Sequence, residues 1–222
     1  MRSFTMRTVR WMASGLALVA LMPAIGSAQS SRLFQDSWFW GAKFGLMSYS
    51  TAAQGNSTAP TVGIDWVITR SKGALYIAGE QAFFNATSAV QDRATVPTSY
   101  RVALRDMQRF TAAALAFPVT WKTFRPYGGI GFSMNLIQHA ALVDPVTDPQ
   151  QQTVVGSAVN DQKDRVSFIT MAGLQGQYRR FSLFGQLTYM PAKANFLLNG
   201  RTTYILEAGI RYNVGSSIGK AH

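Results

Sequence analysis

The chain has 222 residues, of which 47% are hydrophobic and only 14% are charged, and its 21 Lys and Arg outnumber its 10 Asp and Glu. A sequence with this composition is too apolar to be disordered, and its length suits a single folded domain. The absence of cysteine excludes disulfides, cysteine-ligated zinc or iron–sulfur centres and a thiol nucleophile. Few charges combined with abundant glycine and aromatic residues favour a β-protein with a partly apolar exterior.

The first 28 residues have the three parts of a secretory signal peptide. Three arginines within the first ten residues form a positive start without any acid, residues 16–22 are apolar, and residues 26–28 are small. The apolar stretch is shorter than the ~20 residues that a membrane-spanning helix needs. We therefore expect residues 1–28 to be removed on export and residues 29–222 to form the mature domain.

Hydrophobicity of period two predicts strands along the rest of the chain. The clearest case is residues 203–214, where every even-numbered residue is apolar or aromatic and most odd-numbered ones are polar or small. Residues 108–120 are the weakest case, because apolar residues occur at both parities and an alanine-rich middle leaves a helix as the alternative. The expected strands, in chain order, are residues 38–48, 62–69, 74–84, 108–120, 126–137, 166–178, 181–190 and 203–214.

The connections between these strands alternate between long and short. The long ones are residues 50–60, 85–107, 138–165 and 191–201, and the short ones are residues 71–73, 121–125 and 179–180. Outer-membrane barrels combine an even number of antiparallel strands with short periplasmic turns, long outer loops and alternating lipid-facing and lumen-facing residues. The pattern predicts an all-β fold, an eight-stranded antiparallel up-and-down transmembrane β-barrel.

Large aromatic residues concentrate near the predicted strand ends. Aromatic residues are common in β-strands in general, which explains their abundance but not their position. Bands of aromatic residues at the two membrane interfaces explain their position at the strand ends. On the side of the short turns the band contains Trp38, Trp40, Trp66, Tyr76, Trp121, Phe124, Tyr127, Tyr178, Phe181 and Tyr212, and on the side of the long loops Tyr49, Phe83, Tyr189 and Tyr204.

Four segments resemble the small outer-membrane β-barrel proteins of the OmpA-transmembrane and OmpX-like kind. They are WGAKFG at residues 40–45, FRPYGGIG at 124–131, YRRFSLFG at 178–185 and the closing strand at 206–212. The resemblance covers roughly residues 37–214. It implies an integral outer-membrane protein of a Gram-negative cell envelope, inserted by the barrel-assembly machinery. One departure is that about ten residues follow Tyr212, whereas the family usually ends at an aromatic residue of the last strand.

Charged residues inside the predicted strands are few. Charge at membrane depth is tolerated when it points inward or is paired, and an eight-stranded barrel has an interior just wide enough for side chains to fill. The first and last strands are neighbours in a closed barrel, so we expect Lys43 to meet Glu207, whereas the parity of Arg109 does not settle its direction. The expected lumen network is Lys43, Asp65, Glu80, Glu207 and Arg211. It predicts a closed lumen, with a narrow gated pore as an alternative.

Residues suited to catalysis or metal binding are scarce, since the chain has only two histidines, His139 and His222. Ser133 is six residues from His139, about 20 Å along an extended strand, which is too far for a hydrogen bond. The acids of the longest loop lack the spacing of a calcium loop. We expect no enzyme activity, cofactor or metal.

The excess of basic residues is divided between both rims of the predicted barrel. No concentrated basic stripe of the kind that binds nucleic acid is present, and cationic collars fit the anionic headgroups on either side of a membrane. The outer set gives candidate lipopolysaccharide contacts at Arg101, Arg105, Lys163, Arg165, Lys193 and Arg201.

The sequence thus predicts an outer-membrane barrel with a structural role or an interaction role carried by its long loops, with membrane lipid and an unidentified surface molecule as partners. The alternative from another class is an exported soluble barrel resembling lipocalins, which would enclose an apolar ligand. That alternative requires the two faces of every strand to be inverted, with the aromatic and aliphatic face turned inward.

Overall fold

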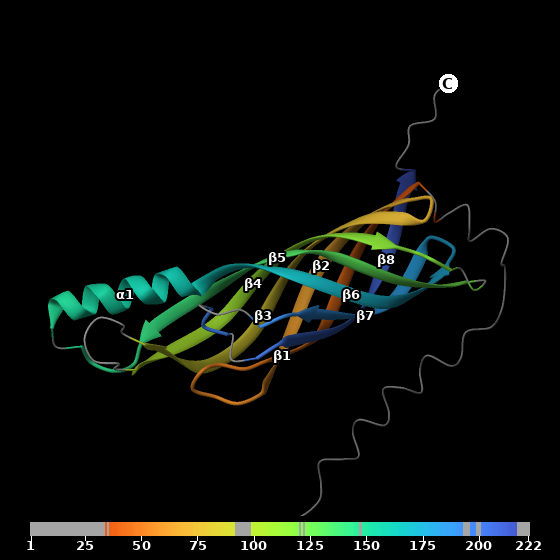
Figure 1. Cartoon of the computed structure of the whole chain (residues 1–222). Coiled ribbons are helices and arrows are strands. Elements are labelled where there is room, and N and C mark those ends of the chain that lie inside the picture. Colours follow the sequence, from red (N-terminus) through yellow and green to blue (C-terminus); the bar gives the residue numbers. More distant parts are fainter. Residues whose placement is uncertain are drawn as a thin grey trace, which may run out of the picture.

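The computed structural model describes residues 34, 36–91, 99–119, 121, 123–146, 148–192, 196–198 and 201–216, so the expected signal peptide lies outside the described residues. Eight antiparallel strands form a closed barrel in which each strand pairs with its neighbours in sequence and the last pairs with the first (Figure 1). The strands are β1 (Ser37–Tyr49), β2 (Ser57–Arg70), β3 (Gly73–Gln91), β4 (Ser99–Ala116), β5 (Phe124–Leu142), β6 (Asp164–Tyr178), β7 (Phe181–Met190) and β8 (Thr203–Ser216). The predicted fold is confirmed.

Three neighbouring strands are longer than the sequence pattern predicts. β3 and β5 have 19 residues each and β4 has 18, whereas β7 has 10. At about 3.3 Å per residue a 19-residue strand runs for roughly 60 Å, well beyond an apolar band of about 25 Å even when tilted. The outer ends of β3, β4 and β5 therefore project beyond the barrel as a three-stranded extension of the same sheet, which we call the projecting sheet, on the side of the long loops (Figure 1).

A helix that the sequence analysis did not predict lies beside this projection. α1 (Pro149–Lys163) begins at the N-cap Asp148, whose carboxylate accepts the backbone N–H of Gln150 at 2.9 Å, and proline occupies the first helical position. Its buried residues are Val155 and Val159. Within the described residues no helix is long and apolar enough to cross a membrane.

The alternation of β4 reverses at Asp106. Asp106 has a φ of 54°, its carboxylate accepts the N–H of Phe84 at 3.2 Å, and the β3–β4 register shifts between Ala82 and Asn85. Two residues of β3, Phe83 and Phe84, lie opposite the single residue Asp106, and a bulge of this kind interrupts the ladder. Before it the odd-numbered residues of β4 are exposed, and after it the even-numbered ones are. Residues 108–116 belong to this strand, so the helix alternative is wrong. Apolar residues occur there at both parities because Leu115 and Phe117 face inward into an apolar cluster while the even-numbered residues face outward.

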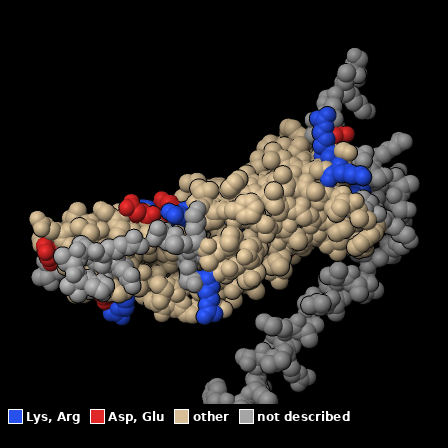
Figure 2. Space-filling view, in the orientation of Figure 1, with Lys and Arg blue, Asp and Glu red and all other residues tan. Residues whose placement is uncertain are grey.

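The exterior of the barrel is apolar. Large side chains on the outer face are strongly exposed, among them Phe44 at 67%, Phe132 at 62% and Leu206 at 61%. Figure 2 shows that, on the face in view, charged side chains lie toward the two ends and leave an uncharged band between them. This arrangement is the opposite of the one that a soluble lipocalin-like barrel requires, because the aromatic and aliphatic face points outward.

Lumen-facing glycines make room for the large side chains of neighbouring strands. Gly41 lies directly opposite both Asp65 and Arg211 in the two ladders of β1. A Cβ at Gly41 would lie 2.7 Å from Arg211 Cγ, and one at Gly45 would lie 2.7 Å from Glu207 Cγ. The glycines of β1 are thus the space into which the charged side chains fit.

Candidate functional site

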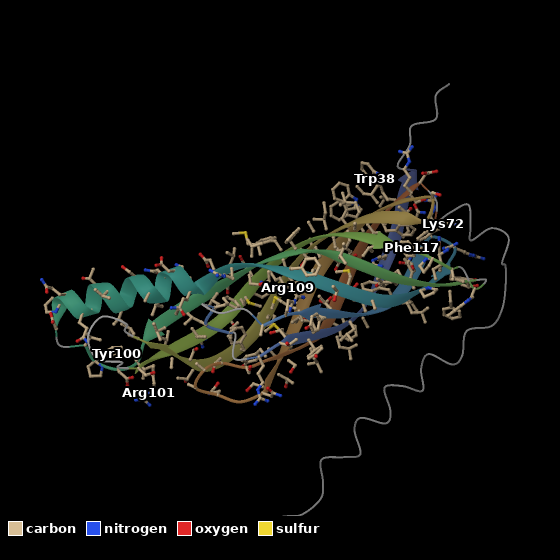
Figure 3. The ribbon with its side chains drawn as sticks, viewed as in Figure 1. Trp38, Lys72, Tyr100, Arg101, Arg109 and Phe117 are labelled. Carbon is tan, nitrogen blue, oxygen red and sulfur yellow. The ribbon has the colours of Figure 1, made fainter. Side chains whose placement is uncertain are left out.

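A layer of six charged side chains lies inside the barrel. Each is at least 92% buried, and the three cations balance the three anions. Figure 3 shows Arg109 midway along the barrel, with Trp38 toward one end and Arg101 at the other. The layer consists of Lys43 on β1, Asp65 on β2, Glu80 on β3, Arg109 on β4, and Glu207 and Arg211 on β8.

Four of these residues form one network in which two cations share two carboxylates. Lys43 Nζ pairs with Glu80 and lies 3.2 Å from Glu207 Oε1. Arg109 Nη2 also pairs with Glu80 and lies 3.5 Å from Glu207 Oε1. Because every charge has an opposite charge beside it, the network reduces the large cost of holding ions away from water.

The other two residues form a separate pair. Arg211 Nε and Nη2 donate to the carboxylate of Asp65 over 2.7–3.1 Å, and Arg211 Nη1 donates to Gln175 Oε1 at 2.9 Å. The guanidinium also lies over the ring of Phe184, 3.6 Å from its centroid. A two-point contact of this kind fixes the geometry of both side chains.

Neutral polar side chains connect the network to the barrel wall. Lys43 Nζ donates to the hydroxyl oxygen of Tyr76 at 2.7 Å, and Gln186 Nε2 donates to Glu207 Oε2 at 2.8 Å. The hydroxyl of Tyr127 donates to Gln186 Oε1 at 3.0 Å. These contacts occupy hydrogen-bonding groups that would otherwise be buried without partners.

The structure brings the sequence-predicted lumen residues together in part. Lys43 and Glu207 meet across β1 and β8, and Glu80 joins them, whereas Asp65 and Arg211 pair apart from the four-residue network. Arg109, whose direction the sequence left open, points inward because the irregularity at Asp106 sets the parity of β4 after it.

Three residues of the predicted aromatic bands are placed wrongly by the sequence analysis. Tyr49, Tyr76 and Tyr127 are at least 95% buried and face inward. Position near a strand end does not distinguish the two faces of a strand, whereas parity does, because Tyr76 shares the inward parity of Glu80 on β3. The remaining aromatic residues of both bands are on the outer face or in the turn at Trp121.

Buried apolar side chains cluster toward both ends of the lumen. At the long-loop end, residues 196–198 pack into a cluster with the projecting sheet and α1. Ser88 Oγ donates to the carbonyl of Leu197 at 2.7 Å, and the N–H of Leu197 donates to the carbonyl of Gln162 in α1 at 3.2 Å. At the short-turn end Phe34 is 97% buried, with the Arg125 guanidinium 4.1 Å from its ring centroid.

The sequence-predicted outer cations have different surroundings. Arg101 donates to Asp144 from Nη2 at 2.8 Å and from Nε at 3.0 Å. This hydrogen bond is the main reason why the pKa of Asp144 lies below its ordinary value. Arg105 and Arg201 are exposed, Lys163 and Arg165 are half-buried, and Lys193 lies outside the described residues.

Residues for other chemistry do not converge. Among the described residues no group of three or more His, Asp and Glu side chains is placed to hold a metal ion. His139 is exposed on the projecting part of β5, whereas Ser133 is fully buried in the lumen.

Comparison with known proteins supports the fold. No protein-family model matches the chain, and no curated protein matches it. Among solved structures, Neisserial surface protein A (NspA) is 14% identical, covering 79% of this chain and 96% of its own with a TM-score of 0.52. Ail, the attachment invasion locus protein of Yersinia pestis, is 10% identical and covers 81% of this chain and 99% of its own, with a TM-score of 0.45. The N-terminal β-barrel domain of Pseudomonas aeruginosa OprF is also 10% identical, with coverages of 81% and 98% and a TM-score of 0.44. The chain therefore has the fold of NspA.

Proposed function

We propose that the protein is an integral outer-membrane barrel of a Gram-negative cell envelope, exported by a signal peptide at residues 1–28. The observation that carries this proposal is the uncharged outer band, where side chains such as Phe44 and Phe132 are more than 60% exposed. A soluble monomer rarely exposes so much contiguous apolar surface, whereas lipid is a favourable environment for it. The short turns then face the periplasm and the long loops face outward.

The proposed role is that of a scaffold with a closed lumen, acting structurally or through its outer projection. The balanced ionic layer and the apolar clusters at both ends support closure. They also give the projecting sheet and α1 a rigid base from which to contact a surface partner. Among the described residues, His139 and Ser133 are not placed to act together and no group of acids and histidines is placed to hold a metal ion. We therefore propose no enzymatic activity.

Membrane fractionation followed by gel electrophoresis of boiled and unboiled detergent extracts tests the membrane assignment. We expect the protein in the outer-membrane fraction, with a mobility shift on boiling because a folded barrel resists mild detergent. A soluble periplasmic protein that needs no detergent contradicts the assignment.

Conductance in planar lipid bilayers tests closure of the lumen and separates it from the narrow gated pore. If the lumen is closed, we expect the current across the bilayer to stay at its baseline value after the barrel inserts. Reproducible unitary steps that change in size when Lys43 is replaced by Met support the gated pore instead.

We further propose that exposed outer cations contact lipopolysaccharide phosphates. Arg105 and Arg201 have the exposure that such a contact needs, whereas Arg101 is already engaged by Asp144. Guanidinium groups bind phosphate through two parallel hydrogen bonds. We expect R105Q/R201Q to lower lipopolysaccharide co-purification more than R101Q does, and unchanged co-purification in the double variant contradicts the proposal.

A further inference from the structure

Five aromatic side chains form a continuous surface on the outside of β7, β8, β1 and β2 near the short turns. We call Trp38, Trp40, Trp66, Phe181 and Tyr212 the aromatic patch. The rings of Trp40 and Trp66 are stacked with centroids 5.4 Å apart, and Trp38 meets Trp66 edge-on at 5.4 Å. Tyr212 lies opposite both Trp40 and Phe181 in the ladders of β8, and its ring centroid is 5.2 Å from that of Phe181.

The patch is concentrated in one sector of the barrel. Three of the five tryptophans of the chain lie in it. At the same end, the outer face of β4 has Ala114 and Ala116, and the exposed aromatic residues on β5 and β6 are Phe124 and Tyr178. A uniform band does not account for three tryptophans in ring contact on the adjacent strands β1 and β2, so this sector has a surface suited to a particular neighbour.

Two arginines border the patch on its periplasmic edge. Arg180 Nη1 lies 3.4 Å from the hydroxyl of Tyr212, to which it donates. Arg70 is exposed and continues the outward row of β2, two residues beyond Ile68, which pairs with Trp38. Figure 2 shows Lys and Arg side chains at this end of the face in view.

We propose that the aromatic patch with Arg70 and Arg180 is a binding site for an anionic phospholipid of the periplasmic leaflet. The guanidinium groups are suited to the phosphate, since Arg forms two-point hydrogen bonds to it. Indole and phenol rings prefer the level of the headgroups, and the apolar rows that continue from Trp40 to Phe44 and from Trp66 to Ile64 provide a surface for acyl chains. The site rests on the proposed membrane location.

Quenching of tryptophan fluorescence by brominated lipids tests the site. Trp11 is removed with the proposed signal peptide, so the mature chain carrying W121F has only the three tryptophans of the patch. It is reconstituted into phosphatidylcholine vesicles containing a small fraction of either brominated phosphatidylglycerol or brominated phosphatidylcholine. We expect stronger quenching by the anionic lipid, corresponding to roughly a fivefold enrichment beside the patch, given the attraction of a surface arginine for anionic lipid.

The variants separate a site from general charge attraction. R70Q/R180Q should remove the preference for the anionic lipid. R179Q is the matched control, because the Arg179 guanidinium lies 5.5 Å from the ring of Tyr178 on β6 rather than beside the patch, and it should keep the preference. Equal quenching by both lipids in the parent chain, or an equal loss of preference in R179Q, overturns the site while leaving the membrane location intact. Weak quenching by both lipids that strengthens as protein is diluted into lipid overturns it in favour of pairing between two copies. No quenching by either lipid at any dilution overturns the membrane location as well.

Discussion

At the scale of single residues, the lumen is organised by matching large charged side chains with glycines on adjacent strands. Gly41 and Gly45 leave the space that Arg211 and Glu207 occupy, and each charge then meets an opposite charge. Alternation and closure of the barrel predict that Lys43 meets Glu207 and that Asp65 and Arg211 point inward, but they do not predict that Arg211 pairs with Asp65. That pairing depends on the register and stagger of the strands around the barrel, which no local pattern specifies.

The pair between Asp65 and Arg211 gives the sharpest test of the ionic layer. We expect D65N to lower the free energy of unfolding by about 3–5 kcal/mol, because it leaves a buried guanidinium without its carboxylate. The double variant D65N/R211M should lose much less than the sum of the single changes. Urea unfolding in lipid vesicles measures all three. Additive losses contradict the account, because they mean that the two side chains do not interact.

A glycine pair tests the packing argument. G41A places a Cβ against Asp65 and Arg211, and we expect a loss of about 1–3 kcal/mol in the free energy of unfolding from overpacking. G185A is the control, since the nearest atom to a Cβ there is the carbonyl oxygen of Glu207 at 3.9 Å. Similar stabilities for the two variants in the same urea assay argue against tight packing at Gly41.

The contact between Arg101 and Asp144 has a predictable pH dependence outside the membrane. The Arg101 hydrogen bond lowers the pKa of the Asp144 carboxyl, so the folded state holds the charged form down to lower pH than the unfolded state does. The stabilisation is therefore present above the unfolded pKa and is lost as pH falls through the folded pKa. Carboxyl carbon NMR should show the pKa of Asp144 rising toward its ordinary value in R101Q. An identical titration in both proteins means that the contact does not form in solution.

At the scale of whole elements, the sequence predicts the membrane part of each strand better than the projection. Alternation between lipid and lumen gives a strong period-two signal in β8 and β1. In the outer ends of β3, β4 and β5 the exposed face is polar or small and the signal weakens, so these ends are assigned to loops. The sequence does not predict α1 because its hydrophobic pattern is also weak. Only Val155 and Val159 are buried on it, too few to give a helical period.

Those two valines hold α1 against the projecting sheet. V159S should release the helix, because losing a buried valine side chain costs about 1–2 kcal/mol, and limited proteolysis within residues 149–163 should become roughly tenfold faster. V154S is the control on the same helix, since Val154 is 51% exposed. Both variants should keep the mobility shift on boiling. Equal cleavage of the two variants contradicts the docking of α1.

At the scale of the whole molecule, the barrel combines an apolar exterior, a layer of buried and balanced charges, and a cluster of buried apolar side chains toward each end. The sequence predicts the number of strands, their antiparallel order and the difference between a short-turn end and a long-loop end. These follow from the alternation between short and long connections. The packing of Phe34 and residues 196–198 into these clusters does not, because these residues come from segments without a regular hydrophobic pattern. The projecting sheet, formed by the outer ends of β3, β4 and β5, extends the barrel on the side of the long loops.

The most direct test of the membrane-spanning barrel is a spin-label scan in reconstituted vesicles, which the cysteine-free chain makes simple. Single replacements Leu206→Cys and Ile210→Cys lie on the outer face of β8, and Arg105→Cys lies on the projecting part of β4. The account predicts that labels at positions 206 and 210 are accessible to oxygen, which partitions into lipid, and protected from a water-soluble nickel chelate, with the reverse at position 105. Strong access of the nickel chelate to positions 206 and 210 would contradict it, because those side chains would then face water.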